Sequence, residues 1–418
     1  MPRNSSAAPR RAKNKTWYFV VELGPGLDSK GQWRERRQAY RRGYLTKAAA
    51  QEAMDLLRSE SAAGTYVAPN GQTVREFLVE DWLPARRAQL AESTWGSYER
   101  NVRHHVIPNI GGLRLQALDG TALNRMYATL LKSGRKRGQQ SAGLKPRTVR
   151  YIHTIVHAAL GDAVKLQKVQ SNAANKATPP SAKSARSPEM KTWTAAQLAE
   201  FLGRTAGDRF GYAWSFLATT GCRRGEALGL RWNDVDLNRG LASIRQQIVA
   251  LPRPSGRGTE PRVVAGTKTG QDRVVELDTR TTASLRQWKK QQSTVRLQLG
   301  AAYEDNGLVF PRPDGKPFHP EAFSKTFDRR LRRQDFADIP RIRLHDFRHT
   351  WATLALEAGV DIAIVSKQLG HASPTITWNT YQHVRKGMQG NAAERVADLI
   401  FGPVDAEEGD EGEAAATG

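Results

Sequence analysis

The sequence predicts a multidomain α+β protein: a small three-stranded sheet with one helix, then an all-α bundle, then a mainly α domain with a small antiparallel sheet. Three observations support this. The chain has 418 residues, which suggests two to three domains of about 150 residues each. Aromatic and β-branched residues precede helical periodicity, which begins near Thr46. A stretch rich in Ala, Ser, Pro and Lys, residues 172–191, separates two helical regions.

These composition changes divide the chain into six expected segments. They are a basic disordered arm at 1–15, a sheet-and-helix module at 16–62, a helical bundle at 70–171, a linker at 172–191, the largest domain at 192–403 and an acidic disordered tail at 404–418.

The first module is rich in strand-forming residues. The run Trp17 to Leu23 is a strand that we expect Gly24-Pro25-Gly26 to break, and a basic segment follows from Gln32 to Tyr44. A helix beginning near Thr46 carries small and apolar residues on one face, namely Ala50, Ala53, Met54 and Leu57.

The second module shows helical patterns throughout. Thr73 and Glu76 form a capping box, and further helices are expected at 93–105, 121–131 and 146–166. The last of these has one apolar face, made of Val149, Ile152, Ile155, Val156, Ala159, Leu160 and Ala163.

The largest domain begins with another capping pattern, Thr194 to Gln197. Helices dominate it, while Leu241 to Leu251, Arg262 to Ala265 and Arg273 to Leu277 are expected to form one small sheet with Lys268 on a turn.

The charge balance points to a polyanionic partner. The formal net charge is +23 and the pI about 10.4, and no apolar run is long enough for a membrane span, so nucleic acid is the economical choice. The single cysteine, Cys222, excludes an intrachain disulfide and a Cys-rich zinc site, which fits a reducing cytoplasm. We therefore expect a cytoplasmic protein that is associated with the nucleoid when it is bound to DNA.

The most specific signal is a set of polar residues in fixed order across the C-terminal half: Arg223, Lys268, His345, Arg348, His371 and Tyr381. Their neighbourhoods read Thr-Thr-Gly-Cys-Arg-Arg-Gly-Glu at 219–226, Thr-Lys-Thr-Gly at 267–270, Leu-His-Asp-Phe-Arg-His-Thr at 344–350, Leu-Gly-His at 369–371 and Thr-Tyr at 380–381. Taken singly, each element has a structural explanation, such as a helix salt bridge between Arg223 and Glu226. Their joint occurrence in one order favours a common site.

This pattern resembles the tyrosine recombinase (phage integrase) family over roughly residues 190 to 400. Arg223 matches the first arginine box, His345 and Arg348 the HxxR motif, Gly370-His371 the LGH motif, and Tyr381 the nucleophile. The match departs at Cys222, where the family more often has an aliphatic residue, and at Gly225, where it more often has serine. Neither change removes a side chain on which the expected reaction depends.

The chemistry of phosphodiester transfer suits these residue types. Arginines present a charged planar fork that matches two phosphate oxygens, so Arg223 and Arg348 are expected to clamp the scissile phosphate. The Tyr381 phenol must have its proton removed or displaced as it attacks, which a nearby imidazole or a strongly positive site could do, and His345 is the candidate base. The resemblance implies that Lys268 is the general acid and that the product is a 3′-phosphotyrosyl bond, and His371 would contact a phosphate oxygen or position the others. No metal or nucleotide cofactor is required.

The resemblance also implies a layout and partners. Residues 16–62 resemble an AP2-like arm-binding domain, and residues 70–171 resemble the core-binding domain that grips DNA opposite the catalytic domain. The expected assembly is a homotetramer on two attachment sites of double-stranded DNA, with the apolar segment 391–401 docking on a neighbouring protomer. An excisionase and a host DNA-bending protein are possible partners, and the acidic tail is expected to compete with DNA for the basic surface.

Three alternatives remain open from sequence alone. A type IB topoisomerase activity needs the same chemistry, and a DNA-binding regulator could keep the fold without cutting. The third is a zinc site, because His345 and His349 are four residues apart beside Asp346, close to the HExxH pattern. Arg348 in the same turn and the lack of an evident third ligand argue against that site.

Overall fold

The computed structural model describes residues 7–27, 33–135, 142–186, 190–253, 258–266, 272–386 and 400. The chain divides into two compact units, residues 1–188 and 189–418, and this boundary falls inside the segment predicted as a linker. Among the described helices none is long and apolar enough to cross a lipid bilayer.

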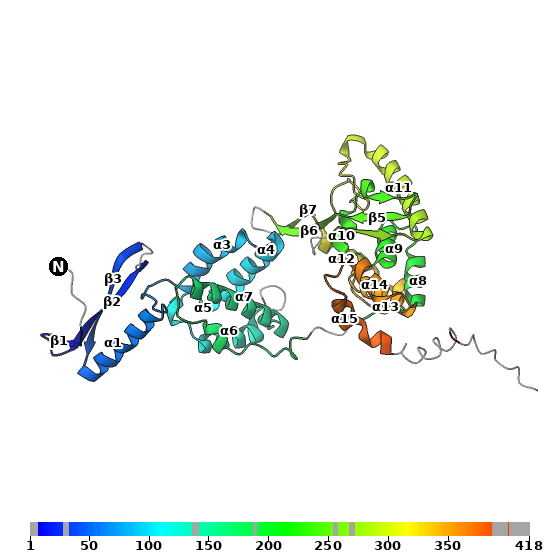
Figure 1. Ribbon diagram of the computed structural model, residues 1–418. Coiled ribbons are helices and arrows are strands. Elements are labelled where there is room, and N and C mark those ends of the chain that lie inside the picture. Colours follow the sequence, from blue (N-terminus) through cyan, green and yellow to red (C-terminus); the bar gives the residue numbers. More distant parts are fainter. Residues whose placement is uncertain are drawn as a thin grey trace, which may run out of the picture. The chain divides into compact units, whose positions relative to one another are not determined.

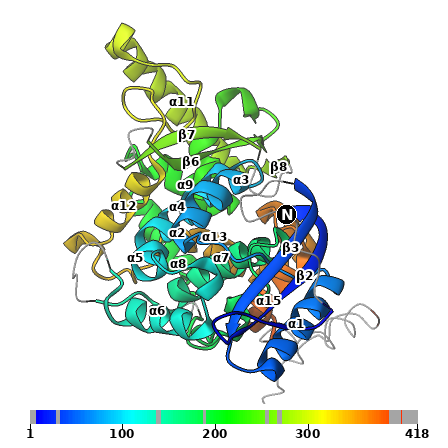
Figure 2. The same cartoon turned by 90° about the vertical axis from the view of Figure 1, so that its left-hand side faces the viewer.

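The first unit begins with an antiparallel sheet in the order β1-β2-β3, with strands β1 (Arg10–Arg11), β2 (Trp17–Leu27) and β3 (Trp33–Tyr44). Helix α1 (Lys47–Ala62) packs on β2, and Figure 2 shows it beside the two long strands. Thr46 caps α1 by accepting from the Ala49 amide. The apolar faces meet in a small core of Phe19, Val21, Ala39, Ala50, Met54 and Leu57.

Two sequence predictions fail in this module. The Gly24-Pro25-Gly26 run does not end the strand, because β2 continues to Leu27 through register shifts between Glu22 and Gly26 that accommodate the irregular residues as bulges. Arg10 and Arg11, expected in a disordered arm, form a strand because they pair with Tyr18 and Trp17.

The rest of the first unit is helical, as predicted. Short π-helical or 3-10 segments are labelled η, with η1 and η2 being π-helical and the others 3-10. The elements are α2 (Val74–Glu76), η1 (Phe77–Trp82), α3 (Leu83–Arg87), α4 (Glu92–Asn101), η2 (Val102–Val106), α5 (Ile107–Ile110), η3 (Leu115–Ala117), α6 (Gly120–Ser133), α7 (Pro146–Lys165) and η4 (Ala173–Lys176). The Thr73–Glu76 capping box is present, and all seven residues predicted for the apolar face of α7 are buried. The predicted linker is not extended at its start, because Ala173 and Ala174 of η4 are buried in the bundle core.

The second unit holds the helices that carry the motifs. In order they are α8 (Ala195–Arg204), α9 (Gly211–Thr220), α10 (Arg224–Gly229), η5 (Trp232–Asp234), α11 (Thr279–Leu299), η6 (Gly300–Ala302), α12 (Pro320–Arg330), η7 (Gln334–Phe336), α13 (Asp346–Glu357), α14 (Ile362–Leu369) and α15 (Pro374–Lys386). The predicted capping box at Thr194 and Gln197 opens α8. Figure 1 shows α13, α14 and α15 together, and all three pairs are in contact.

The strands of the second unit form two sheets rather than the single one predicted. β4 (Val235–Asp236), β5 (Leu241–Ile244) and β8 (Arg273–Glu276) make one, in the order β4-β5-β8, while β6 (Gln246–Pro252) and β7 (Thr259–Ala265) make a separate hairpin. The predicted strand 241–251 is therefore divided at Arg245, because its two halves pair with different partners.

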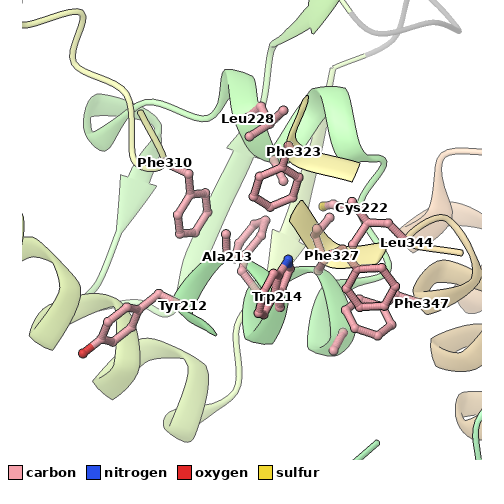
Figure 3. Packing of buried hydrophobic residues seen from close by; sticks show 14 of the residues in the cluster. Tyr212, Ala213, Trp214, Cys222, Leu228, Phe310, Phe323, Phe327, Leu344 and Phe347 are labelled. Carbon is pink, nitrogen blue, oxygen red and sulfur yellow. The ribbon is translucent and has the colours of Figure 1, made fainter. Parts of the chain in front are cut away.

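Helix α13 lies between two cores of the second unit. Phe347 belongs to the larger core, where Figure 3 shows it with Leu344 and Cys222 near Phe327 and Trp214. Ala352 and Leu356, farther along α13, pack with Val365, Leu369 and Tyr381 in the smaller core. Because α13 packs into both cores, it places Arg348 between the first arginine box and the segment that carries Tyr381.

Candidate active site

A glycine turn places Arg223 at the start of α10. Helix α9 ends at Gly221, whose φ of +64° is left-handed, and a Cβ there would lie 2.8 Å from Cε3 of Trp351. Glycine therefore satisfies both the backbone and the packing. Gly225 has a similar reason, since a Cβ there would lie 2.8 Å from the Ile248 carbonyl oxygen of β6.

Glu226 fixes the Arg223 side chain. The Arg223 amide donates to Oε2 of Glu226 at 2.9 Å and its Nη1 donates to Oε1 at 2.8 Å, so the salt bridge considered from the sequence exists. Arg223 Nη2 donates to the Gly370 carbonyl oxygen at 3.0 Å. The guanidinium thus binds residues of both the first arginine box and the LGH motif, while the side chain remains 21% exposed.

A second arginine, which the sequence did not single out, shares the same carboxylate. Arg273 of β8 donates to Glu226 at 2.5 and 3.1 Å, and its Nε donates to the Gln368 carbonyl oxygen at 2.9 Å. Burial by itself would raise the pKa of Glu226, but hydrogen bonds and charges from Arg273 and Arg223 outweigh it and hold that pKa below its usual value. Glu226 is therefore an ionised, fully buried bridge.

Arg348 offers a buried donor that the described part of the chain does not use. Its side chain lies within α13 at 4% residue exposure, and Nη1 donates to the Gly221 carbonyl oxygen at 2.9 Å. Nη2 is buried without a hydrogen-bond partner among the described residues. Burial, followed by the charge of Arg223, lowers the pKa of Arg348 to about 10, so the group stays cationic at neutral pH. A desolvated cation with a vacant N–H is suited to binding an anion.

The two motif histidines are neutral at pH 7. Although His345 is exposed as a whole residue, desolvation of its ring, together with His349 and Arg348, lowers its pKa to about 4. Burial, Arg348 and Arg223 lower the pKa of His371 to about 4 as well. His371 follows Gly370, the left-handed cap of α14, and its Nδ1 is 2.7 Å from the Thr377 hydroxyl of α15.

Tyr381 lies on α15 at 1% exposure, and its phenolic oxygen is 2.7 Å from Nδ1 of His349. Burial raises the pKa of Tyr381 to about 12, although the charge of Arg348 opposes that rise. The phenol is therefore protonated at neutral pH and needs a base before it can act as a nucleophile.

Together, the described elements bring Arg223, His345, Arg348, His371 and Tyr381 into one electrostatic neighbourhood, since the charges of Arg223 and Arg348 act on the others' pKa values. Lys268 lies outside the described residues. It falls between β7 and β8, and β8 begins with Arg273, the partner of Glu226.

The zinc alternative finds no geometric support. The Asp346 carboxylate is engaged by the Arg343 side chain and amide, at 2.7 to 3.1 Å, and Nδ1 of His349 is engaged by the Tyr381 phenol. Within the described ranges no three His, Cys, Asp or Glu side chains cluster as metal ligands.

Three residues with contacts in the site escaped the sequence prediction: His349, Arg273 and Thr377. His349 was visible only as the partner of His345 four residues earlier, and Thr377 lies one helical turn before Tyr381, which is a usable signal. Arg273 is one of 64 basic residues and had no local signal.

Family comparisons agree with this geometry. Residues 196–388 match the model of the phage integrase family, and residues 73–131 match that of the phage integrase N-terminal SAM-like domain. The chain belongs to the phage integrase family. Similar members are a tyrosine recombinase XerC-like protein of Caldanaerobacter subterraneus subsp. tengcongensis, 24% identical over 93% of this chain and 98% of its own, and an integrase of Streptomyces ambofaciens, 26% identical over 93% and 94%.

Solved integrase structures share the fold. The Tn1549 transposon integrase in complex with a circular intermediate DNA matches with a TM-score of 0.59 at 17% identity, over 77% of this chain and 100% of that one. A lambda integrase dimer bound to a COC′ core site matches with a TM-score of 0.51 at 12% identity, over 91% and 96%. This phage integrase family chain therefore has the integrase fold as well as the family's motif order.

Proposed function

We propose that this protein is a site-specific DNA recombinase, an integrase that cleaves and rejoins DNA strands through a 3′-phosphotyrosyl intermediate to integrate or excise a phage or mobile element. The observation that carries the proposal is the vacant Nη2 of Arg348, a buried cationic donor whose charge also acts on the Tyr381 phenol. A scissile phosphate would supply the missing acceptor and receive the nucleophile at the same place.

The arginines stabilise the charge that develops on the phosphate. Arg223 and Arg348 are held by carbonyl oxygens of Gly370 and Gly221, so their remaining N–H groups are oriented before the substrate arrives. Donors that need no reorganisation during reaction lower the barrier more than mobile ones do. Glu226 pairs with Arg223 and Arg273, and within the described residues it forms no salt bridge with Arg348.

The histidines and Lys268 are assigned the proton transfers and the remaining phosphate contact. His371 uses Nδ1 for Thr377, which leaves Nε2 to approach a non-bridging oxygen. His345 is neutral at working pH and can accept a hydrogen bond or a proton. Lys268, by family resemblance, protonates the departing 5′ oxygen.

Double-stranded DNA is the proposed partner, supported by the net charge of +23 and by the DNA bound in the similar Tn1549 and lambda integrase structures. A lambda integrase tetramer bound to a Holliday junction, similar at a TM-score of 0.50 and 12% identity over 89% of this chain and 98% of that one, supports a homotetramer as the working assembly. The segment 391–401 lies outside the described residues except for residue 400, so its docking on a neighbour stays a proposal. An excisionase and a host bending protein are also proposals.

The test is covalent trapping on a suicide substrate built from the element's own ends. Wild-type protein should form a protein–DNA adduct in the presence of EDTA, and Tyr381→Phe should form none while binding the DNA nearly as well, because only one hydroxyl is lost. Adducts that persist in Tyr381→Phe would place the nucleophile elsewhere. Wild-type binding without any adduct would favour a non-cutting regulator, and relaxation of supercoils without strand exchange would favour a type IB topoisomerase activity.

A further inference from the structure

The Tyr381 phenol has a specific hydrogen-bond partner, and that partner is not the HxxR histidine. Its oxygen lies 2.7 Å from Nδ1 of His349, one helical turn after His345 on α13. The rings of His345 and His349 contact each other edge to face with centroids 5.2 Å apart. A general base must be within hydrogen-bond reach of the proton that it removes. Of the two neighbouring imidazoles, His349 meets that condition.

We propose that His349 is the group that accepts the proton of the Tyr381 hydroxyl during strand cleavage and returns it during rejoining. This inference rests on the proposed function, since it assigns one step of that reaction. It gives His345 a different task, a contact with the phosphate or with the His349 ring.

The surroundings of His349 are consistent with a neutral ring that can accept a proton. Burial lowers its pKa, and the charges of Arg348 and Arg343 act in the same direction while Asp346 opposes them. Its ring contacts those of His345, the N-cap residue of α13, and of Tyr381 on α15. It also lies close enough to His371, which follows α14, to contribute to the lowered pKa of that residue. In the neutral tautomer with hydrogen on Nε2, Nδ1 is the acceptor and the phenol is the donor.

The step balances without an external reagent. The Oη–H proton passes to Nδ1 of His349 as the phenolic oxygen forms its bond to phosphorus and the P–O5′ bond breaks. The 5′ oxygen takes a proton from the general acid assigned to Lys268. In rejoining, the 5′ hydroxyl returns its proton to the deprotonated Lys268 as its oxygen forms the bond to phosphorus. The P–O bond to Tyr381 breaks, and the departing phenolate recovers its proton from the imidazolium of His349.

The deep burial of the phenol sets one requirement. Tyr381 is 1% exposed, so a phosphate reaches it only after the site opens locally. The hydrogen bond joins two helices, α13 and α15, that are in contact and share a core with Ala352, Leu356 and Leu369. The proposal requires that His349 and Tyr381 stay paired through this contact while the phosphate side opens. A bond that served only to hold the phenol in a resting position would break at that point.

The experiment compares His349→Gln with His345→Gln in the full-length protein on the suicide substrate. Glutamine can accept a hydrogen bond from the phenol but cannot take its proton. Each variant is prepared with tyrosine and with a fluorotyrosine of lower phenol pKa at position 381, because a more acidic phenol depends less on a base. Thermal unfolding and DNA affinity are measured for every protein, so that loss of fold or binding is separated from loss of chemistry.

The expected result is a cleavage rate for His349→Gln lower by about 10²- to 10⁴-fold, the usual contribution of a general base, and largely restored by fluorotyrosine. His345→Gln should show no such restoration. The proposal would be overturned if His349→Gln cleaved as fast as wild type. Faster cleavage would also overturn it, because the hydrogen bond would then be a restraint on the phenol. A slow variant that fluorotyrosine does not restore would also overturn it and leave His349 a positioning residue. If wild type forms no adduct, the proposed function itself fails.

Discussion

The Glu226 carboxylate lies fully buried against the Arg273 guanidinium, with hydrogen bonds of 2.5 and 3.1 Å, and it also holds Arg223 at 2.8 Å. Arg273 comes from β8, Arg223 from the start of α10, and the Gly370 and Gln368 carbonyl oxygens that they bind come from the end of α14. One carboxylate therefore joins three segments that carry or adjoin the motifs. Its loss should affect both stability and catalysis.

Glu226→Ala should lower the free energy of unfolding by about 3–5 kcal/mol, because it leaves the buried Arg273 cation without its partner. Chemical denaturation measures this change. The matched control is Glu200→Ala, which removes an exposed carboxylate from Arg204 and should cost about 1 kcal/mol or less. Similar losses of unfolding free energy in both variants would show that the buried bridge stabilises the fold no more than an exposed salt bridge does.

The same carboxylate predicts a pH dependence of stability. The pKa of Glu226 is lower in the folded protein than its ordinary value of 4.5, so the ionised bridge stabilises the fold fully above pH 4.5. That contribution is lost as pH falls through the lower folded pKa. The stability difference between wild type and Glu226→Gln should therefore be largest at neutral pH and shrink in acid. A difference that stays constant down to strongly acidic pH would contradict an ionised Glu226.

Arg348→Ala should reduce the single-turnover cleavage rate by about 10²- to 10³-fold, the typical effect of removing one preorganised donor from an oxyanion. Arg348→Lys keeps a cation but cannot both bind the Gly221 carbonyl oxygen and present a planar fork, so it should recover little of the rate. Quench-flow trapping of the adduct measures both variants. Full activity in Arg348→Lys would mean that charge alone is needed.

Thr377→Val tests the hydrogen bond that orients His371. The hydroxyl is fully buried and 2.7 Å from Nδ1, so its replacement by a methyl group leaves the ring without that partner at nearly constant volume. Cleavage should fall severalfold, with a loss of unfolding free energy of about 1 kcal/mol. Thr377→Ser keeps the hydroxyl and should retain the rate. Equal loss in the two variants would point to packing instead.

Lys268→Ala tests the general acid, which lies outside the described residues. Cleavage should fall strongly on ordinary DNA and return on a substrate with sulfur in place of the scissile 5′ oxygen, because a thiolate leaves without protonation. Adduct formation on the paired substrates measures this. His349→Gln provides the contrast, since loss of a base is not corrected by a better leaving group. Lys268→Ala that stays slow on the sulfur substrate would remove lysine from the acid role.

Local sequence patterns predicted much of the fold because short-range physics decides them. The capping boxes at Thr73 and Thr194 need only a side chain and an amide three residues apart, and the apolar face of α7 needs only helical spacing. The small sheets were predicted less well. Nothing local indicates that the strand expected over 241–251 divides at Arg245, because the choice between β8 and β7 as partner is made by distant residues.

The sequence by itself determined the family motifs, their order and the residue types able to hold a phosphate and attack it, because those depend on side-chain chemistry and local turns such as the one at Gly221. Only the tertiary structure decided which groups meet. It paired the Tyr381 phenol with His349 and joined Glu226 to Arg273, contacts across 32 and 47 residues that burial creates by bringing polar groups out of water and onto one another.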